Sequence, residues 1–432
     1  MIPLAKKLDV SRRHQISIFM ESPVGQNLTF SRFGDVKIVD WPVKMYPEYH
    51  RDIENFRYEL FWGRPMYKPQ DMLNAWKRLS GVTRRMLNEN FTEFKAQILD
   101  QKWDLVISDS LTITGLMISL FSNASLAVLH PSVPYNVDLV RRSIPDAWSY
   151  TPAMFVPKMT YDHRNLFDRV STLWTDLMDV LVSSYADYRI IVPRFRPYHN
   201  GLSLHALSTT SNYFLYTHTE ILDYSKPVTH DTISMGSSCN YEPVHLDPDL
   251  QTFIEDPSSK GTILVAFWHY IDWNNAPNST LSHILSTLQR FPQYRIVLQF
   301  DYQKIGGHLW SAKWVPQQSL LNHPSTKLFV NHGGMKTLSE TTCAGVPQIV
   351  VPFFYDQNRN GLMVEKSGCG RTFDKTNLIT GRQNLGDLIQ SILINDTYRK
   401  NAQRIKKLLI DRPMEPLDYE HRKLCIIIEN VI

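Results

Sequence analysis

The sequence predicts an α/β protein with two domains, each built around a doubly wound parallel sheet. The chain has 432 residues, which is more than one hydrophobic core usually organises. Short apolar segments alternate with helical patterns across residues 15–189, and a second alternation starts at residue 261. Between them, residues 223–249 are rich in Pro, Asp, His and Ser, as linkers often are. We therefore expect one domain over residues 1–235 and the other over residues 236–415.

The first half shows the alternation expected of parallel strands joined by helices. Apolar runs predict strands at residues 15–20, 103–108 and 124–130. Helical patterns predict helices at residues 71–100, 112–122 and 161–189. The first of these helices is expected to break near Gly81. Residues 131–157 are rich in proline and aromatic side chains without a clear period, which indicates an irregular loop beside a cleft.

The second half repeats the pattern. Apolar runs predict strands at residues 262–267, 294–300, 327–331 and 348–351. Helices are predicted at residues 280–290, 335–344, 384–395, 396–410 and 416–432. Asn384 and Asp396 stand at helix starts, where a side-chain oxygen can accept hydrogen bonds from the first free N–H groups, so we expect both to be N-caps.

The composition indicates a globular protein and argues against several classes of function. Hydrophobic residues make up 43% of the chain and charged residues 20%, which are values typical of folded domains. The formal net charge of +4 is small for this length, and basic residues occur in pairs such as Arg84-Arg85. We therefore expect no nucleic-acid partner and interpret these pairs as solvated surface. No G-x-G-x-x-G follows a predicted strand, which argues against a dinucleotide oxidoreductase.

The cysteines predict neither a metal site nor a dense disulfide framework. The four cysteines are Cys239, Cys343, Cys369 and Cys425. Their wide spacing does not match the pairs that bind zinc or the clusters of small secreted domains. Cys343 lies inside the predicted helix 335–344, where we expect a buried thiol.

Residues 314–357 form the most informative stretch of the chain. They read W-V-P-Q-Q-S-L-L-N-H-P-S-T-K-L-F-V-N-H-G-G-M-K-T-L-S-E-T-T-C-A-G-V-P-Q-I-V-V-P-F-F-Y-D-Q. His332, Gly333 and Gly334 form a turn between a predicted strand and a predicted helix. Such a glycine turn lets backbone N–H groups approach an anion at the helix N-terminus, where the helix dipole favours negative charge. The His332 side chain can donate to the same anion.

Polar and aromatic residues around this turn suit the other parts of a sugar nucleotide. Trp314 offers a flat face for a base, and Gln317 offers an amide for its edge. Glu340 lies on the predicted helix and can accept hydrogen bonds from a ribose. Asp356 and Gln357 follow the next predicted strand and can bind sugar hydroxyls. Together with the turn, these residues suit a nucleoside diphosphate sugar.

The ordered motifs of residues 314–357 closely resemble the donor signature of the UDP-glycosyltransferases, the glucuronosyltransferase family. The resemblance covers most of the chain and is strongest over residues 261–374. It implies the GT-B architecture, in which two doubly wound domains face a central cleft and the last helix, here residues 416–432, packs back on the first domain. It also implies transfer of glucuronate or glucose from a UDP-sugar to small lipophilic acceptors, with inversion at the anomeric centre.

The resemblance further implies that no cofactor and no metal ion take part. The triplet Asp247-Pro248-Asp249 lies in the Pro-rich linker rather than at a strand end, so we interpret it as a turn. Family members reside in the endoplasmic reticulum and usually carry an N-terminal signal peptide and a C-terminal transmembrane helix. Neither feature is seen in this sequence. Membrane association is therefore expected from the resemblance alone.

The resemblance implies a catalytic aspartate but leaves the catalytic histidine without a match. In this family a histidine removes the acceptor's proton, and an aspartate holds that histidine in the right tautomer. Asp109, at the end of predicted strand 103–108, matches the aspartate, although an N-cap for the next helix is an alternative role. Arg13-His14 matches a later Gly-His pair, so the histidine would precede Met1. A second hypothesis is therefore a non-catalytic or truncated homologue that binds UDP-sugar without the general base.

Two further positions depart from the family pattern. Phe267-Trp268-His269 stands where the family has Phe-Gly-Ser or Phe-Gly-Thr, and Trp268 places an indole where glycine would let the backbone approach phosphates. Lys336-Thr337 replaces the usual Asn-Ser. Thr337 can supply the missing hydroxyl. Lys336 can contact a phosphate or form an i,i+4 salt bridge with Glu340 that competes with ribose binding.

Local positive charge gives a hypothesis for the donor sugar. Arg359 and Lys336 are the cations nearest in sequence to the sugar-binding pair, and a cation near C6 would favour glucuronate over glucose. The alternative interpretation is that Arg359 is a surface residue.

The acceptor is expected to bind beside Asp109 and the loop of residues 131–157. The aromatic residues of that loop favour flat apolar acceptors. They are Tyr135, Trp148, Tyr150 and Phe155.

Overall fold

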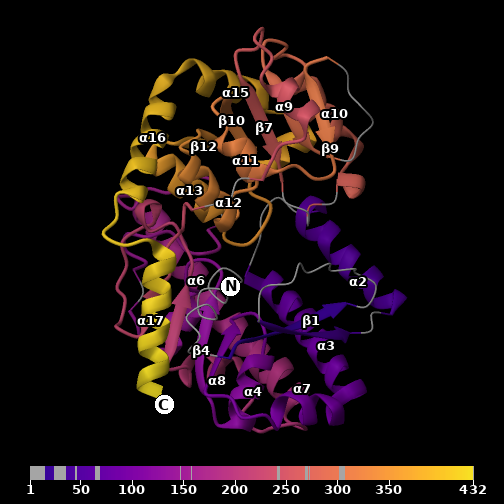
Figure 1. The fold of residues 1–432 in the computed structure, drawn as a ribbon, viewed down its shortest axis with the longest axis vertical. Coiled ribbons are helices and arrows are strands. Elements are labelled where there is room, and N and C mark those ends of the chain that lie inside the picture. Colours follow the sequence, from indigo (N-terminus) through magenta and orange to yellow (C-terminus); the bar gives the residue numbers. More distant parts are fainter. Residues whose placement is uncertain are drawn as a thin grey trace.

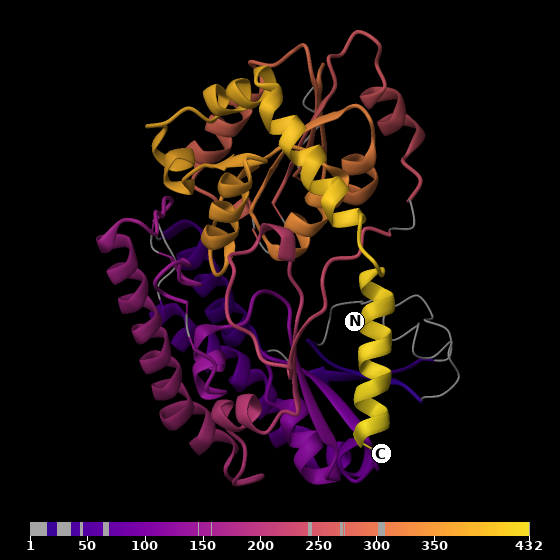
Figure 2. The ribbon, with the colours of Figure 1, turned by 90° about the vertical axis from the view of Figure 1, so that its left-hand side faces the viewer.

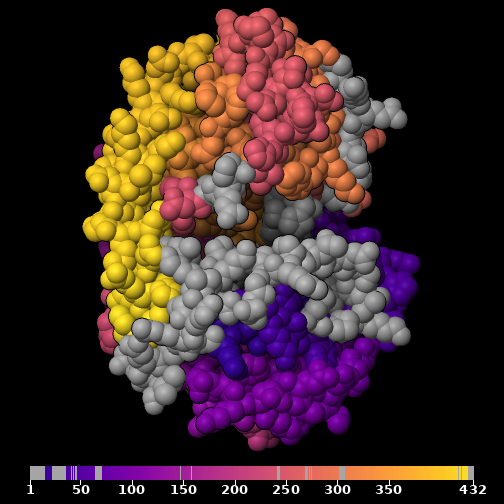
Figure 3. Space-filling model, viewed as in Figure 1, coloured from indigo at the N-terminus to yellow at the C-terminus, as the bar shows by residue number. Residues whose placement is uncertain are grey.

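The computed structural model shows two halves, each containing parallel strands flanked by helices (Figure 1). The residues it describes are 15–23, 36–43, 46–63, 69–145, 147–156, 158–240, 244–267, 271, 273–300 and 307–431. In Figure 1 the N-terminal half lies below the C-terminal half. The last two helices, α16 (Asp396–Ile410) and α17 (Pro416–Val431), form a continuous strip along one side of both halves (Figure 3).

The C-terminal half contains one parallel sheet with the strand order β12-β11-β10-β7-β8-β9. The strands are β7 (Thr262–Ala266), β8 (Arg295–Gln299), β9 (Leu309–Ala312), β10 (Thr326–Asn331), β11 (Gln348–Val350) and β12 (Gly370–Thr372). The order reverses between β7 and β10, which makes the sheet doubly wound, as predicted. Ligands of such sheets bind at the carboxyl ends of the two strands where the order reverses.

The helices of the C-terminal half are α9 (Pro248–Ile254), α10 (Asn278–Leu288), α11 (Gln317–Asn322), α12 (Met335–Ala344), α13 (Gln357–Ser367), α14 (Lys375–Thr380), α15 (Leu385–Ile394) and α16. Of these, α10, α12, α15 and α16 begin and end within two residues of the predicted positions, whereas α9, α11, α13 and α14 were not predicted. Asn384 caps α15, since its Oδ1 accepts a hydrogen bond from the Gly386 N–H at 2.8 Å. The cap predicted at Asp396 is wrong, because Asn395 accepts from the Thr397 N–H instead. Asp247 of the D-x-D triplet caps α9 by accepting from the Asp249 N–H.

The N-terminal half contains a four-stranded parallel sheet, β3-β4-β5-β6, and a separate parallel pair, β1-β2. The strands are β1 (Ser17–Pro23), β2 (Lys37–Val43), β3 (Leu105–Asp109), β4 (Ser125–His130), β5 (Tyr213–Tyr216) and β6 (Thr232–Ser234). β6 lies inside the predicted linker, so the linker prediction was wrong at this point. A strand of three residues between polar neighbours leaves no periodic pattern in the sequence.

The helices of the N-terminal half cover these strands. They are α2 (Pro47–Tyr58), α3 (Pro69–Phe94), α4 (Thr114–Ser122), α5 (Asn136–Arg141), α6 (Leu166–Ala186), α7 (Val192–Phe195) and α8 (Leu204–Thr209). The break predicted near Gly81 is wrong, because α3 continues through it. The backbone instead departs from helical geometry at Asn90, with φ −135° and ψ 25°. A Cβ at position 81 would lie 3.3 Å from the Tyr49 hydroxyl, so close packing accounts for the glycine.

The two groups of strands in the N-terminal half meet in one hydrophobic core. Phe94 of α3 packs against Phe19 of β1 and Trp41 of β2, with ring centroids 5.5 and 5.4 Å apart. Glu21 of β1 accepts hydrogen bonds from Thr83 of α3 and Thr114 of α4. Burial raises the pKa of Glu21, although these two bonds oppose the shift. β1 is thus anchored by helix contacts as well as by β2.

Helix α17 returns from the C-terminal half and packs along the N-terminal sheet (Figure 2). Leu424 is fully buried in a cluster with side chains from β4, β5 and β6. These partners are Ala127, Leu129, Leu215 and Ile233. Among the described residues, no helix is both long enough and apolar enough to cross a membrane.

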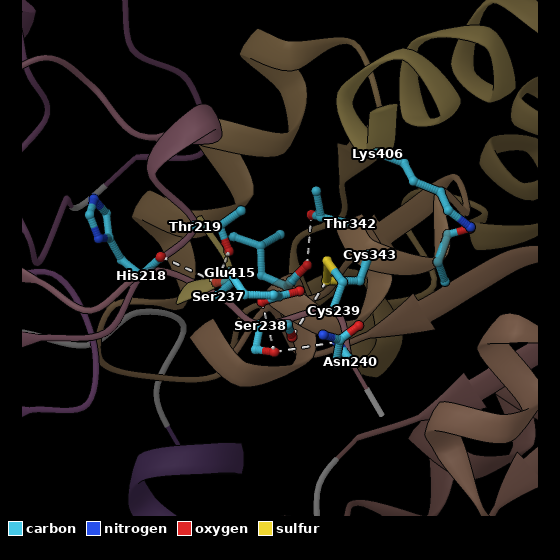
Figure 4. Close-up of a disulfide and its surroundings, with 12 residues drawn as sticks. His218, Thr219, Ser237, Ser238, Cys239, Asn240, Thr342, Cys343, Lys406 and Glu415 are labelled. Atoms are coloured by element: carbon cyan, nitrogen blue, oxygen red, sulfur yellow. Dashed lines mark hydrogen bonds between the residues drawn. A yellow bond between two sulfur atoms is a disulfide. The ribbon is translucent and has the colours of Figure 1, made fainter. Parts of the chain in front are cut away.

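A disulfide joins Cys239, which follows β6, to Cys343 of α12 (Figure 4). The expectation of a buried thiol at Cys343 is therefore wrong. The two cysteines are 104 residues apart in sequence, which is why spacing gave no sign of the pair. The bond ties the segment between the two sheets to the helix that carries Thr337 and Glu340. Cys369 and Cys425 are free.

Removing this disulfide should destabilise the protein. Closing a loop of this length restricts the unfolded chain, so Cys343→Ser should lower the free energy of unfolding by about 2–4 kcal/mol. Urea denaturation under non-reducing conditions measures the change, and Cys425→Ser serves as the control. Equal stability of the parent protein with and without reductant would contradict the prediction.

Candidate functional site

The signature residues gather at the point where the strand order of the C-terminal sheet reverses. β10 ends at Asn331, which pairs with Ala266 at the end of β7. The turn His332-Gly333-Gly334 follows at once, and α12 begins at Met335. The sheet topology therefore places this turn in the crevice where parallel sheets of this kind bind ligands.

The turn is rigid because two buried asparagines hold its backbone. Asn331 accepts a hydrogen bond from the Gly333 N–H at 2.8 Å, and Asn360 of α13 donates to the Gly333 carbonyl at 2.9 Å. Gly333 has φ +81°, and a Cβ there would lie 2.4 Å from Val350 Cγ1. Only glycine fits this position, both for its conformation and for the close approach of β11.

The N-terminus of α12 has no side-chain cap. Its N-cap is Gly334, which has no side chain to accept from the first N–H groups. The helix dipole adds partial positive charge at this end. His332 and Thr337 are buried beside it and can donate from their side chains. That the turn holds a phosphate group stays a prediction.

Glu340 is buried on α12 and already accepts hydrogen bonds from two amides. Gln317 Nε2 lies 2.5 Å from one carboxylate oxygen, and Gln318 Nε2 lies 2.9 Å from the other. Lys336 Nζ is 3.9 Å from Glu340, and its side chain is 87% exposed, so this salt bridge is weak. A carboxylate has about four acceptor positions, so two remain for ribose hydroxyls.

The two residues predicted to bind the base, Trp314 and Gln317, differ in their surroundings. Trp314 is 67% exposed, so its indole face is free to stack on a planar group. Gln317 directs its amide nitrogen at Glu340, as described above, rather than outward. Its role in this structure is therefore to orient the carboxylate. Trp268 and His269 lie outside the described residues.

Asp356 and Gln357 are both buried where the two halves meet. Asp356 accepts hydrogen bonds from Ser132 of the N-terminal half and from Asn360. Burial raises the pKa of Asp356, while these two bonds oppose the shift. Gln357 Oε1 accepts from the Phe353 and Phe354 N–H groups and thereby fixes the loop before α13. Ser132 and Asn360 both donate to the same oxygen of Asp356, Oδ2.

Arg359 is buried and forms its ion pair with a carboxylate other than Asp356. Its guanidinium lies 2.6 Å from Asp223, and the two side chains are 5% and 4% exposed. Burial alone would raise the pKa of Asp223. The charge of Arg359 nevertheless holds that pKa well below its usual range. Arg359 therefore ties α13 to the end of the N-terminal half. The interpretation of Arg359 as a surface residue is wrong, and its charge is not available to a sugar carboxylate.

Asp109 lies at the exposed carboxyl end of β3. Its Oδ1 accepts a hydrogen bond from the Leu111 N–H at 2.7 Å. The protein packed around it raises its pKa by desolvation. Among the described residues it has no histidine partner. The neighbouring Ser110 instead bonds to His130 Nδ1 at 2.7 Å, and burial lowers the pKa of His130 to about 3.

The aromatic residues of the acceptor loop divide into two groups. Tyr135 and Phe155 are buried and pack against Tyr355 of the C-terminal half, with ring centroids 5.4 and 5.9 Å away. Trp148 and Tyr150 are exposed. The loop therefore contributes an aromatic contact between the halves as well as side chains open to solvent.

A small polar cavity lies behind Ser110 and Tyr135. Its volume is about 20 Å³, and Asp138 of α5 and Asp179 of α6 contribute to its lining. Ser208 donates to Asp138 at 2.6 Å, whereas Asp179 Oδ2 has no hydrogen-bond partner among the described residues. Burial, and then the charge of Asp138, raises the pKa of Asp179 to about 7. The cavity has room for about one water molecule.

Sequence reasoning missed four residues that complete the site. They are Ser132, Asn331, Asn360 and Gln318. Two of them had a local signal, since Asn360 is one helical turn beyond Asp356 and Gln318 is next to Gln317. Ser132 had none, because its contact to Asp356 joins positions 224 residues apart in sequence.

The buried Asp179 should make stability depend on pH. An exposed aspartate has a pKa of about 3.9. The folded protein therefore keeps a proton that the unfolded chain releases, and stability falls as the pH rises from about 4 to about 7. Asp179→Asn removes this loss of stability. Because one pKa unit corresponds to about 1.4 kcal/mol, the variant should be more stable than the parent at pH 8 by about 1–4 kcal/mol.

Chemical denaturation at pH 5 and pH 8 measures this effect. Ser183→Ala, which removes a neighbour of Asp179 and keeps the carboxylate, should retain the parent's pH dependence. A difference between Asp179→Asn and the parent that is the same at both pH values would contradict the assignment.

Solved structures share the architecture described above over nearly the whole chain. A glycotransferase of kitacinnamycin matches with a TM-score of 0.64 and 15% identity, covering 100% of this chain and 94% of that one. A UDP-glucose: anthocyanidin 3-O-glucosyltransferase in complex with UDP matches with a TM-score of 0.62 and 16% identity, covering 99% and 96%. These are GT-B glycosyltransferases, so the predicted fold is confirmed.

Sequence comparison gives the family. UDP-glucuronosyltransferase 1A4 of Oryctolagus cuniculus is 24% identical over 326 residues, 74% of this chain and 59% of that protein. The putative UDP-glucuronosyltransferase ugt-48 of Caenorhabditis elegans is 29% identical over 233 residues, 52% and 44% respectively. The chain thus spans about three-fifths or less of these relatives. The family model "UDP-glucoronosyl and UDP-glucosyl transferase" matches residues 6–422, and the chain belongs to this family.

Proposed function

We propose that this protein binds a UDP-sugar at the α12 turn and transfers the sugar, with inversion, to a small lipophilic acceptor. The observation that carries the proposal is the uncapped N-terminus of α12 beside the buried Glu340 carboxylate. Backbone N–H groups with His332 and Thr337 would hold the diphosphate. Glu340 would accept from the ribose, and Trp314 would stack on the uracil.

The acceptor would enter between the halves, near Asp109 and the loop that carries Trp148 and Tyr150. These two exposed aromatic side chains suit a flat apolar molecule. Closure of the halves against Ser132 and Tyr355 would exclude water from the transfer. No metal is needed in this scheme, because the helix terminus and donors stabilise the leaving diphosphate.

The donor sugar is proposed as a hexose, glucose or glucuronate. Asp356 would bind hydroxyls that the two sugars share. The cation argument for glucuronate does not apply to Arg359, which is engaged by Asp223. Lys336 points into solvent with its side chain 87% exposed, so it also gives no buried partner for a carboxylate.

A second candidate function is UDP-sugar binding without transfer. The observation that favours it is Asp109, which accepts from a backbone N–H and has no histidine among the described residues. Loss of a general base typically lowers a rate by about 10²–10⁴. Binding and transfer must therefore be measured separately.

We also propose that the protein folds in the secretory pathway. The disulfide between Cys239 and Cys343 supports this, since such bonds persist in oxidising compartments such as the lumen of the endoplasmic reticulum. Association with a membrane is proposed on family membership alone.

Isothermal titration with UDP tests the donor site. The parent protein should bind UDP, and Trp314→Ala should weaken binding roughly tenfold, because stacking on a base contributes about 1–3 kcal/mol. Trp314 is exposed, so this variant should fold normally. Glu340→Ala should weaken binding by about 10–100-fold, because a hydrogen bond to a charged group contributes about 1.5–3 kcal/mol.

The control is Asp396→Ala, which removes an exposed carboxylate on α16. This variant should bind UDP as the parent does. No binding at millimolar UDP by the folded parent would refute both candidate functions. UDP binding together with no transfer from UDP-glucose or UDP-glucuronate to a panel of phenols would favour the second candidate.

A further inference from the structure

A basic groove lies on the N-terminal half, between α2, α3 and α7. Its volume is about 410 Å³. Five cationic side chains line it, together with one carboxylate, Asp52. The cations are Lys77, Arg78, Arg84, Arg85 and Arg194. No residue of the groove belongs to the α12 site or to the Asp109 region.

The groove concentrates charge far beyond the chain's average. Its lining carries a net formal charge of +4, which equals that of the whole 432-residue chain. The one carboxylate is already engaged, since Arg78 lies 2.8 Å from Asp52. Four cations therefore remain without an acidic partner in the lining. The interpretation of Arg84-Arg85 as solvated surface applies to Arg84 only, because Arg85 is half-buried.

Three of the arginines are held in place by contacts other than ion pairs. Arg85 lies over the Tyr49 ring at 4.0 Å from its centroid, and Arg78 lies over Phe56 at 4.3 Å. Arg194 donates to Ser80 Oγ at 2.5 Å and to the Lys77 carbonyl at 2.7 Å. Side chains fixed in this way lose little conformational entropy when they bind a ligand.

Two cationic groups of the lining have unfavourable surroundings. Arg85 Nη1 is buried and has no hydrogen-bond partner among the described residues. Burial, and then the nearby charge of Arg84, lowers the pKa of Arg194. An anion in the groove would give the Arg85 N–H group an acceptor and would offset the repulsion between Arg84 and Arg194.

We propose that this groove binds an anion carrying two or more phosphate groups. Guanidinium groups bind phosphate through paired N–H donors, and several fixed arginines suit several phosphates. A volume of about 410 Å³ lies within the range of small-molecule sites. The ligand would be either a soluble polyphosphorylated molecule or the phosphorylated headgroup of a membrane lipid. The site does not depend on sugar transfer.

Titration with inositol 1,4,5-trisphosphate in the presence of saturating UDP tests the proposal. UDP occupies the α12 site, so that its phosphate-binding groups cannot contribute. One molecule should bind per chain, and Arg84→Glu and Lys77→Glu should each weaken binding at least tenfold. Both side chains are exposed, so both variants should keep the parent's melting temperature.

Arg382→Glu makes the same change of charge on an exposed residue of the C-terminal half and should alter affinity less than twofold. If Arg382→Glu lost as much affinity as Arg84→Glu, the binding would reflect the overall charge of the protein, and the proposed site would be overturned. No binding of the trisphosphate at millimolar concentration would also overturn it. The groove variants should also bind UDP like the parent. Absence of UDP binding with intact trisphosphate binding would refute the proposed function and leave this site standing.

Vesicles distinguish the two sources of the ligand. Sedimentation with phosphatidylcholine vesicles, with and without phosphatidylinositol 4,5-bisphosphate, is the second arm. Binding that needs the bisphosphate lipid and is lost in Arg84→Glu supports the groove as a headgroup site. Binding of the free trisphosphate without vesicle binding supports it as a site for a soluble ligand.

Discussion

The proposed donor site depends on one close approach, between the turn after β10 and the strand β11 beside it. The Gly333 backbone lies so near Val350 that any side chain would collide. Two fully buried amides, Asn331 and Asn360, supply the hydrogen bonds that the buried turn needs. If either were lost, a buried backbone group would be left without a partner, at a cost of about 1–3 kcal/mol. The position of α12, and hence of Glu340, follows from this arrangement.

The same arrangement links the two halves. Asn360 also donates to Asp356, whose carboxylate reaches Ser132 in the N-terminal half. Close by, Lys375 donates to the Leu60 and Phe353 carbonyls, and burial lowers its pKa to about 7. These contacts use the loop that should hold the sugar. The proposed sugar site and the contact between the halves therefore share one loop, and we expect donor binding to be energetically coupled to that contact.

Much of the fold could be predicted because its signals are local. Buried parallel strands appear as continuous apolar runs, and the turn His332-Gly333-Gly334 marks a strand-to-helix junction directly. The limits of α12 came out as predicted, since Gly334 precedes it and Gly345 ends it with φ +67°.

The features that escaped prediction depend on contacts between distant residues. Three contacts join segments that only the folded chain brings together. They are the Cys239–Cys343 bond, the Arg359–Asp223 pair and the Ser132–Asp356 contact. Nothing in the sequence around Arg359 distinguishes a buried cation from a surface one. The roles of His332, Thr337 and the other donor residues stay predictions. The structure places His332 and Thr337 at the start of α12 and Glu340 further along the same helix.

The disulfide has a topological consequence. Residues 239–343 form a covalently closed ring that includes β7, β8, β9 and β10. A protease that cuts once inside this ring produces two polypeptides that stay covalently joined. The pieces of the central sheet then remain at high effective concentration and keep their register. Reduction would release them, so the bond gives the C-terminal half a tolerance of nicking that its hydrogen bonds alone do not provide.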